Sequence, residues 1–196
     1  MTVAIIQYNA GNTRSVSFAL ERLGIVPLVT DNIEAIQSAD KVIFPGVGEA
    51  STAMQYLKDR NLDKIIKSLE QPVLGICLGM QLLCEHSEEN DTPCLGIFNS
   101  HVLRFSLGND QFKVPHVGWN QIENIASPLF SNIEMEPNCY FVHSYYATQC
   151  EQTTADTSYG ITFSAALQKN NFYGVQFHPE KSAGVGEQIL KNFLNI

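Results

Sequence analysis

Hydrophobic residues in the first half of the chain fall alternately into short runs and into helical spacing. Short apolar runs, typical of β-strands, occupy residues 3–8, 26–29, 41–44 and 73–76. Apolar residues spaced by three and four, typical of amphipathic helices, occupy 15–23, 33–38, 50–57 and 62–69. Strands that alternate with helices predict a parallel sheet covered by helices on both faces. In such a sheet the functional residues collect where the strands end.

The second half of the chain has a different pattern. Between residues 94 and 180, β-branched and aromatic residues predict strands at 101–105, 114–123, 139–149, 159–168 and 172–178. Asn170 and Asn171 predict a hairpin turn between the last two, because asparagine tolerates positive φ. A final amphipathic helix is predicted over 186–194. We therefore expect one α/β domain over residues 1–196, with a mostly parallel central sheet flanked by helices and a mixed or antiparallel extension.

The most informative segment lies where the fourth predicted strand ends. Residues 72–81 have the sequence PVLGICLGMQ, with Cys77 two residues from a glycine on either side. This is the cysteine version of the G-x-S-x-G nucleophile elbow, a tight strand-to-helix turn that exposes the reactive atom. At the first turn of a helix, unpaired N–H groups and the positive end of the dipole favour a thiolate. The alternative is a buried structural cysteine beside two packing glycines.

A second segment supplies the groups that a nucleophilic cysteine needs. Residues 172–180, FYGVQFHPE, predict a strand that ends in His178 and Glu180. Side chains two residues apart in an extended chain point to the same side, and Pro179 favours extended geometry at His178. Glu180 would then accept the imidazole N–H and orient the ring. His-Pro-Glu alone is usually only a strand end, but with Cys77 it forms a candidate catalytic triad.

Composition and charge argue against several functional classes. The 196 residues carry a formal net charge of −8, with a pI near 5.0, which argues against nucleic-acid binding. No basic run supports binding to a membrane surface, and no apolar stretch is long enough to span a bilayer. The first residues predict a strand and not a signal peptide. Five irregularly spaced cysteines without a C-x-x-C pair suggest neither a disulfide framework nor a zinc site, and favour a reducing, cytoplasmic setting.

Over essentially its whole length, the chain resembles the class I, triad-type glutamine amidotransferases. More narrowly, it resembles the glutaminase subunits of imidazole glycerol phosphate synthases. The general motifs are PGVG at 45–48, GICLGMQ at 75–81 and HPE at 178–180. The narrower ones are Met80, PHVGWN at 115–120 and YFVHSYY at 140–146. Two places depart from the family pattern: Thr13, where leucine is usual, and residues 49–51, where a small-aromatic-glycine run is usual.

The resemblance implies hydrolysis of glutamine to glutamate and ammonia through a thioester on Cys77. The backbone N–H groups of Leu78 and Val47 would stabilise the oxyanion, and elbow geometry independently favours Leu78. The residues implied to contact glutamine are Gly48, Gln81, Glu89, Ser144 and Tyr145. The residues implied to form a partner interface are His116, Trp119, Asn120, Tyr140 and Lys181. Ordinary helix-surface or strand-packing roles are the alternatives for these two sets, and no metal or organic cofactor is predicted.

The implied partner is a barrel-type synthase (cyclase) subunit that forms a heterodimer with this chain. It would take up the ammonia to make imidazole glycerol phosphate and aminoimidazole carboxamide ribotide in histidine biosynthesis. Gly46 and Gly48 would let the peptide at Val47 flip, so that residues 45–48 act as a switch. One alternative is the same chemistry feeding another acceptor, such as an amidation in surface-polysaccharide sugar synthesis. The other is a non-hydrolytic redox or chaperone-like relative of the fold.

Overall fold

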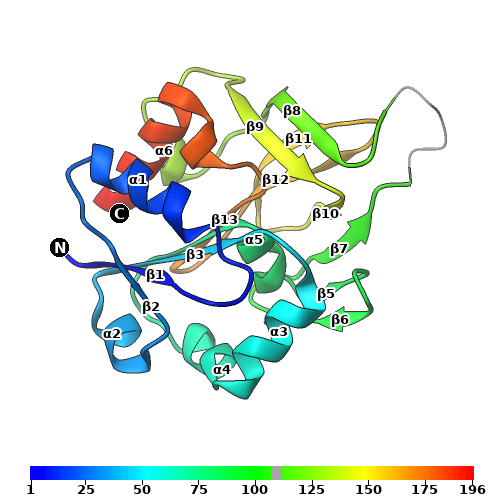
Figure 1. Cartoon of the computed structure of the whole chain (residues 1–196). Helices are drawn as coiled ribbons and strands as arrows, with labels where there is room; N and C mark the ends of the chain where they lie inside the picture. The colour runs from blue at the N-terminus through cyan, green and yellow to red at the C-terminus, as the bar shows by residue number, and fades with distance from the viewer. Residues whose placement is uncertain (107–111) are drawn as a thin grey trace.

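A seven-stranded sheet with helices on both faces forms the centre of the computed structural model, which describes residues 1–106 and 112–196 (Figure 1). The strands of the first half are β1 (Val3–Ile6), β2 (Leu28–Thr30), β3 (Lys41–Gly46) and β4 (Val73–Cys77). Its helices are α1 (Thr13–Arg22), α2 (Ile33–Ser38), α3 (Ala50–Asp59), α4 (Leu62–Lys67) and α5 (Leu78–Leu83). Each strand and helix predicted for this half is confirmed, with its bounds shifted by no more than two residues.

The strand order places the ends of β3 and β4 in the middle of the sheet. The order is β11-β12-β13-β4-β3-β1-β2, with β11 at Thr153–Ser158, β12 at Thr162–Lys169 and β13 at Phe172–Val175. The five strands from β13 to β2 are parallel, whereas β11 and β12 add an antiparallel edge. The predicted hairpin between β12 and β13 is present, and Asn170 has a φ of 53° in its turn. The expected fold class is therefore confirmed.

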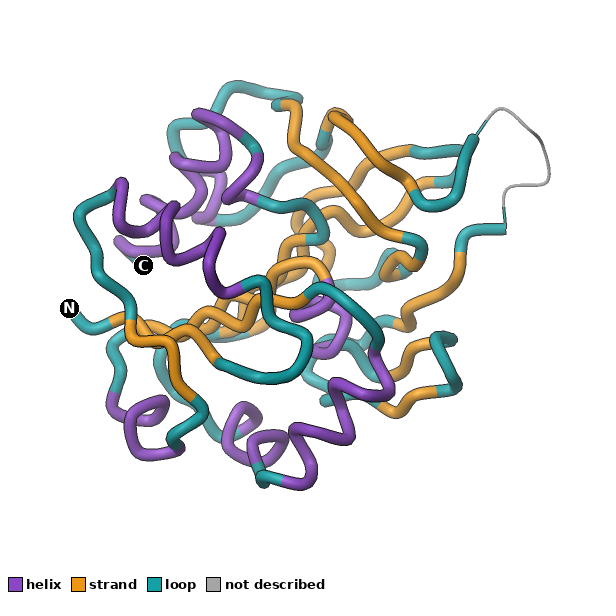
Figure 2. The backbone as a smooth tube through the Cα atoms, viewed as in Figure 1, coloured by secondary structure: helices purple, strands orange, loops and turns teal. Residues whose placement is uncertain are grey.

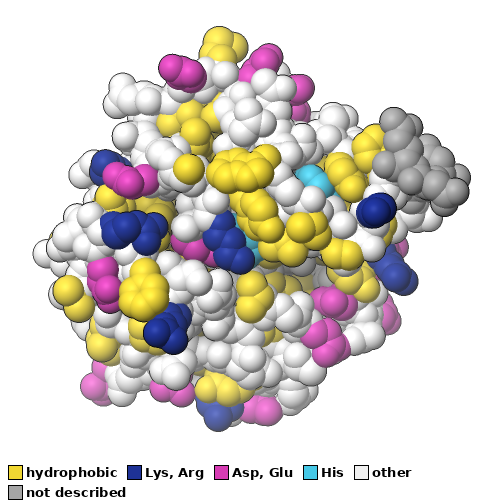
Figure 3. Space-filling view, turned by 45° about the horizontal axis from the view of Figure 1, so that its top comes forward, with side chains coloured by type: hydrophobic (Ala, Val, Ile, Leu, Met, Phe, Trp, Pro, Cys, Tyr) yellow, Lys and Arg dark blue, Asp and Glu magenta, His cyan; other side chains and the backbone are white. Residues whose placement is uncertain are grey.

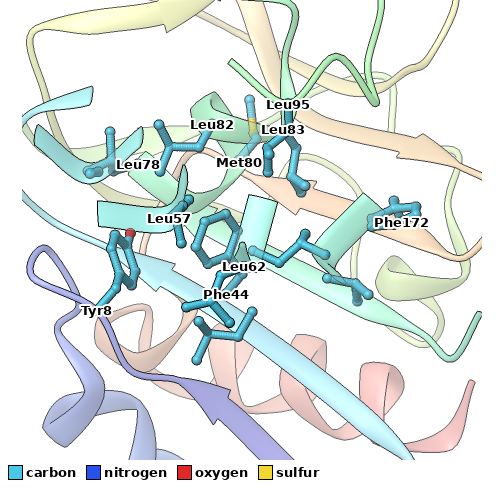
Figure 4. Close-up of a cluster of buried hydrophobic side chains, with 14 of the residues drawn as sticks. Tyr8, Phe44, Leu57, Leu62, Leu78, Met80, Leu82, Leu83, Leu95 and Phe172 are labelled. Atoms are coloured by element: carbon cyan, nitrogen blue, oxygen red, sulfur yellow. The ribbon is translucent and has the colours of Figure 1, made fainter. Parts of the chain in front are cut away.

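Successive side chains of the central strands point to opposite faces of the sheet and contribute to two buried hydrophobic clusters, one on each face. Val42 and Phe44 of β3 pack with α2 to α5 in the first cluster, shown in Figure 4. Ile43, between them, packs in the second cluster with α1 and α6 (Ala183–Asn195). Figure 2 shows the helices lying on either side of the strands. None of the helices in the described residues is long and apolar enough to cross a membrane.

Helix α5 lies very close to the sheet because two strands carry glycines beneath it. Gly75 of β4 and Gly174 of β13 are partners in the parallel register. A Cβ at Gly75 would lie 2.8 Å from the backbone nitrogen of Met80, and one at Gly174 would lie 2.7 Å from Met80 Cγ. Neither position therefore has room for a side chain. The two glycines set the height of α5, and with it the turn that carries Cys77, above the sheet.

The second half adds two small sheets at the edge of this core. Their strands are β5 (His86–Ser87), β6 (Thr92–Pro93), β7 (His101–Arg104), β8 (His116–Gln121), β9 (Asn138–His143) and β10 (Tyr145–Ala147), and short 3₁₀ helices lie at Pro128–Phe130 (η1) and Pro179–Lys181 (η2). The predicted single strand over 139–149 is wrong. It is two strands broken at Ser144, because β9 pairs with β8 whereas β10 pairs with β7. The sequence also did not predict β5, β6 and β11.

Candidate active site

Cys77 lies in a tight turn between β4 and α5, beside the end of β3. Gly46 of β3 is its partner in the parallel register. Its φ of 53° and ψ of −109° are unusual for a residue with a side chain, and such a conformation costs about 1–3 kcal/mol. Helix α5 starts at the next residue, so the N–H of Leu78 belongs to the first turn, which has no intrahelical acceptors. The geometry is that of a nucleophile elbow.

A cavity of about 350 Å³ opens beside Cys77. The residues that line it are Val47, Gly48, Cys77, Leu78, Gln81, Glu89, Pro115, Val142, His143, Ser144 and Tyr145. The predicted nucleophile, both predicted oxyanion residues and all five predicted glutamine contacts therefore line the same cavity. The break at Ser144 contributes to this arrangement, because it turns the chain between two sheets at the wall of the cavity.

Glu89 lies in the turn between β5 and β6 and lines the same cavity. Its Oε2 accepts a hydrogen bond of 2.8 Å from the N–H of Ala50 at the start of α3. Burial raises the pKa of Glu89, the Ala50 N–H opposes this, and the neighbouring Glu49 carboxylate adds to the rise. The carboxylate is thus held in place at the cavity wall, and it is not part of a solvated helix face.

His178 and Glu180 form a buried pair. His178 Nδ1 lies 2.8 Å from Glu180 Oε1, and each side chain is only 1% exposed. The predicted contact is therefore present, but the predicted backbone is not. His178 is extended, with φ of −102° and ψ of 96°, whereas Pro179 starts the turn η2 and Glu180 lies within it. The 3₁₀ turn, and not an extended chain, brings the carboxylate back to the ring.

The charges of this pair depend on each other. Burial alone would lower the pKa of His178, but the adjacent Cys77 sulfur and the Glu180 carboxylate raise it to about 10. Glu180 Oε2 is buried without a hydrogen-bond partner among the described residues, as is His178 Nε2. A buried carboxylate with so few partners is costly unless a cation lies beside it. We therefore infer an imidazolium at His178, with Nε2 free to act on a substrate.

Replacing Glu180 by glutamine is expected to lower kcat for glutamine hydrolysis by about 10²–10⁴-fold. The amide keeps the volume but removes the negative charge that stabilises the imidazolium and fixes its orientation. Steady-state ammonia release measures the effect. Glu187→Gln, an exposed acid on α6 paired with Lys191, is the matched control and should leave kcat unchanged. Equal activity of the two variants would rule out a catalytic role for Glu180.

Gln176 is a site residue that the sequence reasoning missed. Its side chain is fully buried, and its Nε2 lies 3.7 Å from Cys77 Sγ. Its Oε1 accepts a hydrogen bond of 2.9 Å from Nε2 of Gln81, which also donates to the carbonyl oxygen of Tyr145 at 2.9 Å. One signal was available in the sequence. Gln176 is a polar residue within the apolar run FYGVQF at 172–177, two positions before His178.

The loop after β3 holds the Val47 N–H away from the cavity. That N–H donates to the carbonyl oxygen of Ala10 at 2.5 Å, so it is not free to bind an oxyanion in this structure. Gly48 has a φ of 122°, which a residue with a side chain rarely adopts. Gly46 is packed differently, because a Cβ there would lie 2.8 Å from Leu78 Cβ and 2.9 Å from the nitrogen of Gly79. Substitutions at Gly46 therefore disturb packing as well as the loop.

Two buried histidines connect the cavity wall to strand β8. His143 Nδ1 lies 2.7 Å from the carbonyl oxygen of Tyr145, so this nitrogen carries the hydrogen. Its Nε2 then accepts from Nδ1 of His116 at 3.0 Å. Burial lowers the pKa of His143 to about 3 and that of His116 to about 4, so both rings are neutral at pH 7. His116 is only 2% exposed, and the expectation that its side chain forms part of a partner surface is not met.

The other predicted interface residues lie together around strands β8 and β9. Trp119 is 55% exposed and packs edge-on against Tyr140, with ring centroids 6.0 Å apart. Lys181 Nζ lies 5.8 Å from the centre of the Tyr140 ring. Asn120 is half-buried and donates to the carbonyl oxygen of Ser158 at 3.0 Å, so it anchors the strand. Figure 3 shows hydrophobic side chains gathered across one face of the molecule, beside basic ones.

The described residues contain no group of three or more His, Cys, Asp or Glu side chains that could hold a metal ion. All five cysteines are free, and Cys84 and Cys139 are buried within the core clusters. Cys77 lines the cavity, and the His178–Glu180 pair lies close to its sulfur, so a thiol, an imidazole and a carboxylate are available together. Such a set performs acyl transfer through a covalent thioester.

Comparisons with known proteins identify the family of the chain. The model of the family "Glutamine amidotransferase class-I" matches residues 4–196. Solved structures of similar fold include PurLQS from Thermotoga maritima (TM-score 0.75, 16% identity, covering 99% of this chain and 97% of that one). A glutamine amidotransferase from the same organism has a TM-score of 0.65 at 17% identity, covering 100% and 83%. The chain belongs to the class-I glutamine amidotransferase family.

Curated relatives narrow this to one branch of the family. The imidazole glycerol phosphate synthase subunit HisH of Bacteroides fragilis is 56% identical over 196 residues, which is 100% of both chains. The HisH subunit of Pasteurella multocida is 48% identical over 193 residues, covering 98% of this chain and 96% of the relative. Within the class, the chain therefore belongs to the HisH family, the glutaminase subunits of imidazole glycerol phosphate synthase in histidine biosynthesis.

Proposed function

We propose that this chain hydrolyses glutamine to glutamate and ammonia with Cys77 as the nucleophile, and that it delivers the ammonia to a synthase subunit. The observation that carries the proposal is the position of Cys77. It lies at an elbow that lines the cavity, and its sulfur together with the Glu180 carboxylate raises the pKa of His178 to about 10. The chemistry follows from the charges on these three residues.

The first half-reaction forms the thioester. Cys77 Sγ attacks the side-chain amide carbon of glutamine, and the carbonyl electrons move to the oxygen to give a tetrahedral oxyanion. His178 Nε2 donates its proton to the amide nitrogen as the C–N bond breaks, which releases ammonia. In the second half-reaction, neutral His178 takes a proton from water, whose oxygen attacks the thioester and expels the sulfur. Proton transfer of this kind contributes about 10²–10⁴-fold to the rate.

Oxyanion stabilisation needs a change in the loop after β3. The N–H of Leu78 lies at the start of α5, beside the nucleophile, and supplies one donor. The second donor, the N–H of Val47, is turned towards the carbonyl oxygen of Ala10. Rotation of the Gly46–Val47 peptide would exchange that hydrogen bond for one to the oxyanion. We propose that this rotation switches the site between a resting and an active state.

Replacing Val47 by proline removes the N–H and is expected to lower kcat by about 10²–10³-fold while leaving the affinity for glutamine within twofold. The oxyanion exists only after attack, so losing its donor affects the transition state and not the bound substrate. Val47→Ala keeps the N–H and serves as the matched control. Turnover and equilibrium binding are measured side by side. Equal turnover in both variants would exclude Val47 as a donor.

Recognition of glutamine follows from the groups that line the cavity. The hydrogens on Nε2 of Gln81 are taken by Tyr145 and Gln176, which leaves its Oε1 as an acceptor. Together with the Glu89 carboxylate, this oxygen would bind the α-ammonium group of the substrate. Gly48, Ser144 and Tyr145, which line the same cavity, would contact the remaining polar groups of glutamine. We propose that substrate hydrolysis takes place within one domain that spans residues 1–196.

The proposed partner is a barrel-type synthase subunit that binds across Trp119, Tyr140 and Lys181 as a heterodimer. The HisH names of the relatives support this partner over the other ammonia acceptors. The free cysteines fit a cytoplasmic location, where thiols stay reduced. Because ammonia in water is protonated at neutral pH, direct transfer to the partner would keep it nucleophilic.

The experiment that tests this function compares glutamine hydrolysis by the chain alone and with a purified barrel-type subunit and its phosphoribosyl substrate. We expect weak activity alone and strong stimulation by the pair. Trp119 is exposed in the free chain, and tryptophans that become buried at an interface often contribute much of its binding energy, so Trp119→Ala should weaken binding of the subunit by at least tenfold. Met135→Ala, which removes another exposed hydrophobic side chain, is the matched control. Activity that ignores the barrel-type subunit would assign the ammonia to another acceptor.

A further inference from the structure

We propose that Gln176 is a positioning residue that holds Cys77 as a thiolate through a hydrogen bond from its side-chain amide, and that Gln81 fixes the direction of that amide. The proposal rests on Cys77 being the nucleophile. Its evidence is a chain of three hydrogen bonds, buried beneath the elbow, that begins at the backbone carbonyl of Tyr145 and ends at the sulfur.

The direction of each amide in this chain follows from its fixed end. The carbonyl oxygen of Tyr145 can only accept, so the group of Gln81 that faces it at 2.9 Å must be the NH₂. The second hydrogen of that NH₂ then faces Gln176 at 2.9 Å, which requires the oxygen of Gln176 on that side. The NH₂ of Gln176 is therefore turned towards Cys77 Sγ, 3.7 Å away.

Burial makes this hydrogen bond selective for one charge state of the sulfur. Gln176 is fully buried and Gln81 is 5% exposed, so water does not compete with the chain. An N–H donor binds an anion more strongly than a neutral acceptor, and the difference grows in a low-dielectric interior. The amide therefore favours the thiolate over the thiol. The positive charge of His178 attracts the same sulfur, so a neutral hydrogen-bond donor and a nearby cation favour the thiolate together.

The arrangement also gives Gln81 a second role beside the cavity. Its NH₂ orients Gln176, and its oxygen remains for the substrate. Because Tyr145 is both the fixed end of the chain and a lining residue, the backbone of β10 determines where the Gln176 amide points. Loss of the side-chain amide of either Gln81 or Gln176 is therefore expected to make the thiolate of Cys77 less favourable.

The test measures the rate of Cys77 alkylation by iodoacetamide against pH, following the Cys77 peptide by mass spectrometry. Gln176→Met keeps the length of the side chain but has no donor. We expect the pH of half-maximal alkylation to rise by about one unit, with a loss of at least tenfold in kcat. Gln81→Met should shift the profile less, in the same direction. Gln168→Met, the same substitution at a half-buried glutamine that binds Ser127, is the matched control and should not shift it.

A Gln176→Met profile that superimposes on that of the unchanged protein would overturn the proposal, as would an equal shift in Gln168→Met. If Gln176→Met does not fold, as judged by circular dichroism, the Gln81→Met profile decides in the same way. Alkylation requires neither glutamine nor a partner subunit. A shifted profile in a protein that does not hydrolyse glutamine would therefore support the positioning role and contradict the proposed function, so the two failures are distinguishable.

Discussion

Replacing Cys77 by alanine is expected to reduce the rate of glutamine hydrolysis by at least about 10⁴-fold, while the variant still binds glutamine. The residual activity would come from binding and from the oxyanion donors, since removing a nucleophile eliminates the covalent route as a whole. In this variant the sulfur beside His178 is absent. The pKa of His178 should therefore fall from about 10, because Cys77 is one of the groups that raise it. Ammonia release, followed over hours, measures the loss.

The control for this variant is a cysteine outside the cavity. Cys150 is half-buried, and its sulfur lies 3.6 Å from Gln152 Oε1, away from the residues that line the site. Cys150→Ser should keep the turnover within twofold. Hydrolysis that survives in Cys77→Ala at more than a hundredth of the normal rate would contradict the assignment of the nucleophile.

The second large effect is expected at Gly79, two residues after the nucleophile. A Cβ there would lie 1.8 Å from the carbonyl oxygen of Phe44, which is part of the backbone of β3 and cannot move alone. Gly79→Ala therefore has to push α5 away from the strand that leads into the loop 45–48. We expect a loss of about 4 kcal/mol or more in the free energy of unfolding, at the upper end of single substitutions. Chemical denaturation measures it.

Gly184 is the matched control for this loss of stability. It lies in the first turn of α6, and a Cβ there would meet nothing within 4 Å. Gly184→Ala should be neutral or should stabilise the protein by up to about 1 kcal/mol, because alanine has the higher helix propensity. A Gly79→Ala variant as stable as Gly184→Ala would show that α5 does not lie against β3 as described.

The parts of the site that the sequence predicted are those with local signals. Gly75 and Gly79 around Cys77 mark a turn too tight for side chains, and the structure confirms the turn. His178 and Glu180 are neighbours in the sequence, so their contact survived an error in the backbone between them. The parallel sheet was also predicted from local signals, because the spacing of apolar residues within each segment distinguishes a strand from a helix.

The parts that the sequence did not predict depend on contacts between distant segments. The break at Ser144 follows from the pairing of β9 and β10 with different strands, which the continuous aromatic run conceals. His116 is buried because β8 turns that side inward, and a six-residue strand gives no local sign of which side is covered. The Val47 hydrogen bond to Ala10 joins two loops, and no pattern in either loop indicates it.

The most direct test of the central claim is to trap the covalent intermediate. The chain, activated by a barrel-type subunit, is mixed with glutamine, quenched with acid within milliseconds and digested for mass spectrometry. A γ-glutamyl group on the Cys77 peptide, absent from the other four cysteines and accumulating before ammonia release reaches its steady rate, is the predicted result. Steady ammonia release with no acyl group on Cys77 at any time, or with the group on another residue, would contradict the account.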